Sequence, residues 1–298
     1  MFIVKQIVFN DFYKLVERVF GECRLPFRFS KYSNGLYNNF VHVFLLVLKE
    51  KYKQSYRGLV ELADNLNLKQ MLCLSKIPHF TTLHKFLSKL DKNLLAKLVR
   101  VCHKILNLTN ILSAIDGTGF DNIHPSMYYQ NKYGINKGYK NYVNTQLLAD
   151  INSKLILNIE TCTYRKHDSQ FFISLIDPVK HKLRCVLADR GYDSMELREF
   201  CWNNHISNHI DFRMPPKYQS FSSKRLLAKK RFRRNIYHQR STVESVISAV
   251  KRRFGDFVTA RSSHNQQKQV MLKVLAYNIS VLSKHKQKIF CLFIFFTK

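Results

Sequence analysis

The first hundred residues carry apolar side chains at the spacing of helices. Between residues 9 and 20 they recur every three or four positions, and the same spacing returns over residues 40–48. Because about 3.6 residues make one helical turn, this spacing gathers apolar side chains on one face of a helix. We therefore expect residues 1–106 to be helical.

Two of the expected helices begin where a polar residue precedes an apolar run. Residues 55–63 (SYRGLVELA) open with a serine, and residues 77–87 (IPHFTTLHKFL) place Thr81 or Thr82 where either residue can cap a helix. The pair predicts one of two structures. It is either a helix-turn-helix reader of DNA, whose second helix presents His84 and basic residues, or a small helical packing domain.

From residue 111 onward, short apolar runs predict strands. Residues 111–116 (ILSAID) end in Asp116 before a Gly-Thr-Gly turn, and residues 183–189 (LRCVLAD) end in Asp189. Further strands are expected at residues 142–148, 154–161 and 206–214, and helices at residues 195–203 and about 265–284. Strands mixed with helices predict an α/β fold with a mixed sheet, separated from the helical region near residues 107–112.

The segment 237–251 (YHQRSTVESVISAVK) combines an apolar helical face with a polar stripe. From Ser241 its valines and isoleucine follow the spacing of one buried face. Arg240, Glu244 and Lys251 are spaced at i, i+4 and i+11, which places them on roughly one common face. The alternative to a functional stripe is a solvated helix face with an ordinary i, i+4 ion pair.

The net charge of the chain indicates which class of molecule it binds. Its 298 residues include 49 Lys and Arg against 20 Asp and Glu, which gives a formal net charge of +29. A folded chain this basic repels itself unless it meets a polyanion, so nucleic acid is the expected partner and an anionic membrane the second. A general lysine bias is the alternative, and the arginine-rich surface segment expected at residues 217–236 argues against bias alone.

Cysteine usage and the two ends of the chain bear on its compartment. The seven cysteines form no CxxC pair, which is typical of an intracellular protein. The N-terminus lacks the pattern of a signal peptide, and the apolar run at residues 289–296 is too short to span a bilayer. We expect a cytoplasmic protein with no membrane partner, whose apolar tail (residues 289–298) is a packed strand, a helix turn or an untidy end.

Three carboxylates are candidates for chemistry. Asp116 and Asp189 end two expected strands, and strand ends of a sheet share an edge where ligands gather. Together with Glu244 they would repel one another unless cations compensate them. Oxygen ligands suit Mg²⁺ or Mn²⁺, and two such ions about 4 Å apart support phosphoryl transfer.

These residues lie in motifs that resemble a known family. Asp116 in AIDGTGF, Asp189 in LADRGYDS and Glu244 in Tyr-x2-Arg-x3-Glu-x6-Lys resemble the acidic triad of the DDE transposases of bacterial and archaeal insertion sequences. The phrases YRKHDS (164–169), KRRFG (251–255) and SYRGLVELA are also similar to that family. The resemblance covers roughly residues 55–285.

The resemblance implies a ribonuclease H-like catalytic core at residues 109–288, preceded by a helical DNA-end-binding region at residues 1–108. It implies that the three carboxylates hold two Mg²⁺ or Mn²⁺ ions, that two element ends meet in a dimer or larger assembly, and that the protein works at the nucleoid. The residues expected to bind DNA are Tyr237, Arg240, Lys251, Arg252, Arg253, Lys229, Lys230, Arg231, Arg233 and Arg234.

Two other functions are compatible with the same residues. The first is a metal-dependent nuclease of the same fold that does not transpose. The second is a non-catalytic DNA-binding protein, either a repressor of the element or a decayed copy. Metal-dependent nicking distinguishes both enzymes from the binding protein, and strand joining distinguishes the transposase from the nuclease.

Overall fold

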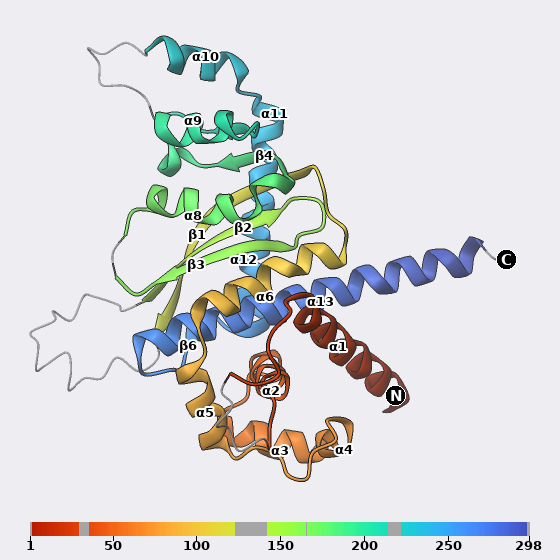
Figure 1. Ribbon diagram of the computed structural model, residues 1–298. Coiled ribbons are helices and arrows are strands. Elements are labelled where there is room, and N and C mark those ends of the chain that lie inside the picture. The colour runs from red at the N-terminus through yellow and green to blue at the C-terminus, as the bar shows by residue number, and fades with distance from the viewer. Residues whose placement is uncertain (1, 30–35, 123–141, 165, 214–221, 297–298) are drawn as a thin grey trace, which may run out of the picture. The chain divides into compact units, whose positions relative to one another are not determined.

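The computed structural model describes most of the chain (Figure 1). The described ranges are residues 2–29, 36–122, 142–164, 166–213 and 222–296. The chain forms two compact units. One consists of residues 1–106 with residues 250–298, and the other of residues 107–249.

The first unit is built almost entirely of helices, as the apolar spacing predicts. Its elements are α1 (Phe2–Glu22), α2 (Asn39–Lys51), α3 (Tyr56–Asn65), α4 (Leu68–Met71), α5 (Phe80–Lys89), α6 (Lys92–Ile105), β6 (Phe257–Val258) and α13 (Ser263–Phe296). Helix α13 packs against α2 and α6. All ten residues from Val41 to Glu50 are buried, so α2 lies at the centre of this unit.

The helices at residues 55–89 differ in detail from the expected pair. Ser55 caps α3 by accepting a hydrogen bond from the Gly58 amide, as expected. The N-cap of α5 is His79 rather than a threonine, and its Nδ1 lies 2.8 Å from the hydroxyl of Thr81. Residues 66–79, which include α4, separate the two helices and exceed the three- or four-residue turn of a helix-turn-helix. Helices α3 and α5 are therefore not joined by the short turn of a helix-turn-helix.

The C-terminal helix is longer than its apolar spacing predicts. Helix α13 starts at Ser263 and continues through residues 289–296, so that part of the apolar tail is helical. Within the described residues, no helix is long and apolar enough to span a membrane. Lys273 of α13 donates to the carbonyl oxygens of Phe254 and Phe257, both at 2.7 Å, and so satisfies groups at the end of the preceding helix.

The second unit is built around a mixed sheet. Its strands are β1 (Ile111–Asn122), β2 (Tyr142–Asp150), β3 (Ile156–Cys162), β4 (Leu183–Ala188) and β5 (Ser207–Ile210). They run in the order β3-β2-β1-β4-β5. Strands β1 to β4 are labelled in Figure 1. Strand β2 pairs antiparallel with β1 and β3, whereas β4 pairs parallel with β1 and β5. The expected α/β class is confirmed, and this order is that of a ribonuclease H-like core.

Helical segments follow the strands of this unit. They are η1 (Asp168–Phe171), α8 (Phe172–Ile176), η2 (Asp177–Lys182), η3 (Arg190–Tyr192), α9 (Met195–Asn203), α10 (Ser223–Arg231), α11 (Arg234–Tyr237), η4 (His238–Arg240) and α12 (Ser241–Phe254). Helix α9 has the expected bounds, and β5 is shorter than the run at residues 206–214. The basic segment is helical in α10 and α11, and its residues 217–221 lie outside the described part.

Asp116 lies inside β1 rather than at its end. The expected Gly-Thr-Gly turn does not form, because β1 continues to Asn122 while paired with β2. The parallel pairing of β1 with β4, in contrast, stops where Ala114 meets Leu187. Asp116 and Asp189 both lie two residues beyond that last pair, so the register places them next to each other where the parallel pairing ends.

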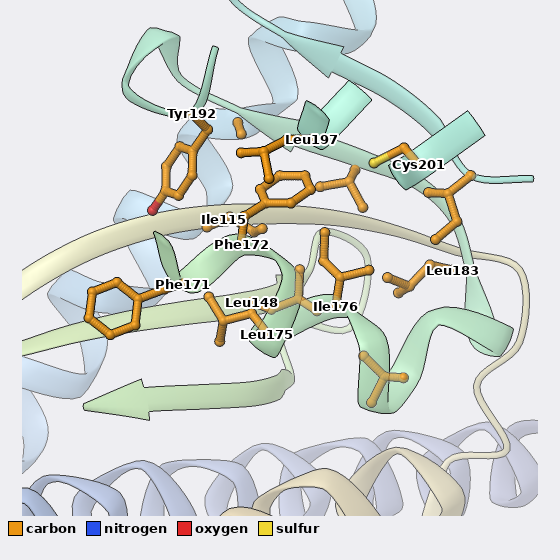
Figure 2. Close-up of a cluster of buried hydrophobic side chains, with 14 of the residues drawn as sticks. Ile115, Leu148, Phe171, Phe172, Leu175, Ile176, Leu183, Tyr192, Leu197 and Cys201 are labelled. Atoms are coloured by element: carbon orange, nitrogen blue, oxygen red, sulfur yellow. The ribbon is translucent and has the colours of Figure 1, made fainter. Parts of the chain in front are cut away.

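The core of this unit fills the space between the sheet and helices α8 and α9 (Figure 2). Ile115 and Leu148 contribute from the sheet, and Phe172 and Leu197 contribute from the helices. Tyr192 lies at the margin of this cluster in Figure 2, away from Leu183, and is itself buried. The core residue Tyr192 therefore lies in the same segment of the chain as Asp189, three residues after it.

A buried ion pair supports the same segment. The N-cap of α9 is Ser194, and the carboxylate of Asp193 just before it binds two arginines. Arg198 contacts it at 2.8 Å and also donates to the Ile210 carbonyl oxygen at 2.9 Å. Arg225 of α10 binds its second oxygen. This carboxylate therefore connects α9, α10 and the end of β5.

Replacing Arg198 with Met should lower the free energy of unfolding by about 3 kcal/mol, because a buried carboxylate loses a partner. The Arg198 side chain is 1% exposed, whereas Lys224, which pairs with Glu199, is 70% exposed. Lys224→Gln is the matched control and should cost less than about 1 kcal/mol. Urea unfolding of both variants measures the difference, and equal losses would contradict a stabilising role for the buried pair.

Candidate active site

Three elements position the three carboxylates. Asp116 comes from β1, Asp189 follows the last residue of β4, and Glu244 lies in the first turn of α12. Backbone amides fix two of them: Gly117 donates to Asp116 Oδ1 at 2.9 Å, and Gly191 donates to Asp189 Oδ1 at 2.8 Å. Helix α12 begins at Ser241 as predicted, with its valine and isoleucine face buried.

The carboxylates share one electrostatic environment. Burial raises the pKa of Asp116, and the charges of Asp189 and Glu244 raise it further. The Gly117 amide and the Arg240 guanidinium act in the opposite direction on this pKa. The side chain of Asp116 is 21% exposed and that of Glu244 is 52% exposed, so the group opens to solvent on the side of Glu244.

Arg240 bridges two of the carboxylates. Its Nη1 lies 3.4 Å from Asp116 Oδ2, and its Nη2 donates to Glu244 Oε1. Burial acts to lower the pKa of Arg240, but Asp116 and Glu244 raise it above its ordinary value. Burial raises the pKa of Tyr237, and the Arg240 guanidinium acts to lower it. Arg240 and Glu244 of the 237–251 segment therefore lie close to Asp116 in the folded protein.

A second network of buried polar groups adjoins the carboxylates. Tyr192 donates its hydroxyl hydrogen to Gln146 Oε1, and Gln146 Nε2 donates to Asp168 Oδ1 at 2.7 Å. Burial raises the pKa of Asp168, and the charge of Asp189 adds to this shift. Burial raises the pKa of Tyr192, and the charges of Asp168, Asp116 and Asp189 raise it further. Asp168 is therefore a fourth acidic group, close enough for the charge of Asp189 to affect its pKa.

A cleft of about 530 Å³ opens beside this network. Its lining residues are Gly117, Thr118, Gly119, Tyr142, Asn144, Gln146, Lys166, His167 and Asp168. A Cβ at Gly117 would lie 2.5 Å from Gln146 Nε2, and a Cβ at Gly119 would lie 2.8 Å from the Tyr142 ring. These glycines let β1 pass close to the polar side chains of β2.

The donor chemistry of the site fits a divalent cation, but the present spacing does not hold one. Carboxylate oxygens are the preferred ligands of Mg²⁺ and Mn²⁺. Within the described ranges, no group of three or more His, Cys, Asp or Glu side chains is close enough to bind a metal ion. The positive charge between Asp116 and Glu244 comes from the Arg240 guanidinium.

The other residues expected to bind DNA lie on helices. Lys251, Arg252 and Arg253 occupy the last turn of α12, with both arginines exposed. Five exposed basic residues come from α10, α11 and the link between them: Lys229, Lys230, Arg231, Arg233 and Arg234. Arg231 lies over the Trp202 ring at 5.8 Å from its centroid.

Sequence reasoning did not single out Gln146 or Tyr192. The local signal for Gln146 is an amide in the middle of β2, directly before the apolar residues 147–149. Tyr192 looks like a surface residue of a turn, because it follows Arg190 and Gly191. Asp168 belongs to the YRKHDS phrase, which carries part of the family resemblance. Their connection depends on strand pairing and helix packing between distant segments.

The folded chain can be compared with known proteins. The family model described as transposase DDE domain matches residues 109–279. An uncharacterized protein of Aquifex aeolicus (strain VF5) is 25% identical over 242 residues, which are 76% of this chain and 75% of that protein. The cryo-EM structure of the piggyBac transposase synaptic complex with hairpin DNA aligns with 94% of this chain and 74% of its own, at 13% identity and a TM-score of 0.46. Because the family model covers more than half of the 298 residues, the chain belongs to the transposase DDE domain family.

Proposed function

We propose that this protein is a DNA transposase that binds the terminal inverted repeats of its insertion sequence and catalyses metal-dependent DNA cleavage and strand transfer. Two observations carry the proposal: the strand register brings Asp116 next to Asp189, and the Arg240 guanidinium joins Asp116 to Glu244. The membership of the chain in the transposase DDE domain family supports it. We assign the chain to the branch with the Tyr-x2-Arg-x3-Glu-x6-Lys signature.

In this proposal, Asp116, Asp189 and Glu244 hold two Mg²⁺ or Mn²⁺ ions. When bound, the ions supply charge stabilisation for the attacking and leaving oxygens of an in-line displacement. The Gly117 and Gly191 amides hold two of the carboxylates in fixed orientations. Gln146 and Tyr192 orient Asp168 beside them, so that four acidic groups face the reacting phosphate.

Basic and aromatic side chains of the 237–251 segment contact the DNA in this proposal. Arg240 provides a planar fork for a phosphate and Lys251 a point charge, while Tyr237 stacks on a base or bonds a phosphate. The exposed residues of α10 and α11 extend this surface. The net charge of +29 attracts DNA without regard to sequence.

The helical residues 1–108 bind the element ends in this proposal, and residues 109–288 cut them. The exposed face of α5 offers His84, Lys85 and Lys89 for DNA contacts. Two ends must be joined in one reaction, so we propose a dimer or larger assembly on DNA. The protein then acts where the DNA is, at the nucleoid in the cytoplasm.

Glu244→Gln should abolish DNA cleavage while DNA binding persists, because the substitution removes one negative charge from the site and leaves the basic surface unchanged. The measurement is incubation of labelled DNA carrying the element ends with Mg²⁺ or with EDTA, alongside a gel-shift assay. Glu196→Gln, an exposed carboxylate of α9, is the control and should cut normally.

Near-normal cutting by Glu244→Gln would refute the site assignment. DNA binding without cutting in the unsubstituted protein would indicate a repressor or a decayed copy. Nicking without joining to a target DNA would indicate a nuclease of the same fold. The same gels therefore distinguish the three functions.

Lys251→Ala should reduce end processing more than it reduces overall DNA affinity. Lys251 lies about two turns beyond Glu244 on the same face of α12, where its charge is aligned with the proposed site. The control is Lys230→Ala on α10, which should weaken binding and cleavage in parallel. Parallel losses for Lys251→Ala would instead place this lysine in the general basic surface.

Tyr192→Phe should lower the cleavage rate about 10-fold, at the lower end of the effect of losing an outer hydrogen-bond partner of a metal site, because Gln146 loses the donor that helps it orient Asp168. The change deletes only the hydroxyl that donates to Gln146 and leaves the buried ring in place. Cleavage rates should be compared with Tyr164→Phe, whose side chain is exposed. An unchanged rate in Tyr192→Phe would exclude the Gln146 network from positioning Asp168.

A further inference from the structure

The guanidinium of Arg240 lies between Asp116 and Glu244, two of the carboxylates that are proposed to bind metal ions. It contacts Asp116 Oδ2 at 3.4 Å and also bonds Glu244 Oε1, so one cation compensates two carboxylates from separate elements. Only 19% of the Arg240 side chain is exposed. The contact is therefore partly shielded from water, where charge interactions are stronger than at an open surface.

The bridge relieves a repulsion that the fold creates. The pKa of Asp116 is raised first by burial and then by Asp189 and Glu244, and Arg240 opposes this shift. Without a cation, ionised carboxylates this close together destabilise one another. Arg240 thus performs in this structure the charge compensation that a divalent ion would perform in the working enzyme.

We propose that Arg240 is an internal counter-ion that exchanges partners, binding Asp116 and Glu244 when the metal site is empty and a DNA phosphate when a divalent ion is bound. This inference rests on the proposed function, because it assigns a regulation to the same site. The planar fork of arginine suits both partners, since carboxylates and phosphates accept the same pair of N–H donors.

The position of Arg240 allows the exchange without a change of fold. Arg240 is the last residue of η4, and α12 begins at the next residue. A rotation of its side chain moves the guanidinium while the backbone of Glu244 stays one helical turn away.

The exchange couples metal binding to DNA binding. A phosphate that attracts the guanidinium frees the carboxylates for a metal ion, and a metal ion on the carboxylates frees the guanidinium for a phosphate. Coupling of this kind is reciprocal and typically changes affinity by about 5- to 150-fold. Arg240 therefore keeps the metal affinity low until DNA is present, which restricts cleavage to the assembled complex.

The experiment measures divalent-ion affinity directly. Ca²⁺, which takes carboxylate oxygens, serves as the probe and is titrated into the full-length protein by calorimetry, with and without a short duplex from the element end. Arg240→Gln should bind Ca²⁺ at least about 5-fold more tightly than the unsubstituted protein without DNA. The duplex should strengthen Ca²⁺ binding in the unsubstituted protein and much less in Arg240→Gln.

Two further variants make the result specific. Lys180→Gln removes the same charge from an exposed ion pair with Asp177 and should leave Ca²⁺ affinity unchanged. Arg240→Lys keeps the charge but loses the fork, so its Ca²⁺ affinity should be intermediate. Arg240→Lys also replaces Arg240→Gln as the test if thermal melting shows that the glutamine variant is unfolded.

The outcomes distinguish this inference from the proposed function. Equal or weaker Ca²⁺ binding by Arg240→Gln, with clear binding by the unsubstituted protein, overturns the exchange and leaves the metal site intact. Absence of Ca²⁺ binding in the unsubstituted protein, with and without DNA, overturns the proposed metal site and the inference with it. Tighter binding in Arg240→Gln, with loss of the DNA effect, supports both.

Discussion

Charge compensation at the edge of the sheet is the constraint on which the rest of the site depends. Asp116, Asp189 and Glu244 come from three elements. Burial raises the pKa of Asp116, and the charges of Asp189 and Glu244 add to this shift. The Arg240 guanidinium compensates two of them directly. The residue that stabilises the site thus shares one segment with Glu244, so the α12 region supplies both an acid and its counter-ion.

The strand register of the sheet fixes where Asp116 and Asp189 lie relative to each other. The parallel pairing of β1 with β4 ends before Asp116 and Asp189, while β1 continues along β2. Glycines in β1 allow Gln146 of β2 to approach closely, and Gln146 connects Tyr192 with Asp168. Tyr192, which belongs to the apolar core, is therefore connected to Asp168 by hydrogen bonds through Gln146.

A second group of buried charges, separate from Asp116, Asp189 and Glu244, holds structural elements together. Asp193 is compensated by Arg198 and Arg225, and this pairing connects α9, α10 and the end of β5. Removing one member of such a group is costly because the remaining charge stays buried. The basic helix α10 is therefore attached to the core by an ion pair, while its lysines are exposed at the surface.

Sequence by itself determined the classes of element and the acidic residues of interest. Period and composition identified the helical first hundred residues, the mixed α/β region and the start of α12 at Ser241, because apolar spacing is a local property. The motifs around Asp116, Asp189 and Glu244 pointed to transposases of the DDE type, which agrees with the family model.

Tertiary structure alone decided how these parts meet. The extension of β1 beyond Asp116, the use of Asp193 as an ion-pair partner and the Tyr192–Gln146–Asp168 network all depend on contacts between distant segments. The contact of Arg240 with Asp116 is of the same kind, since 124 residues separate the two positions along the chain. Local patterns specify which side chains are available, but strand register and helix packing decide which charges become neighbours.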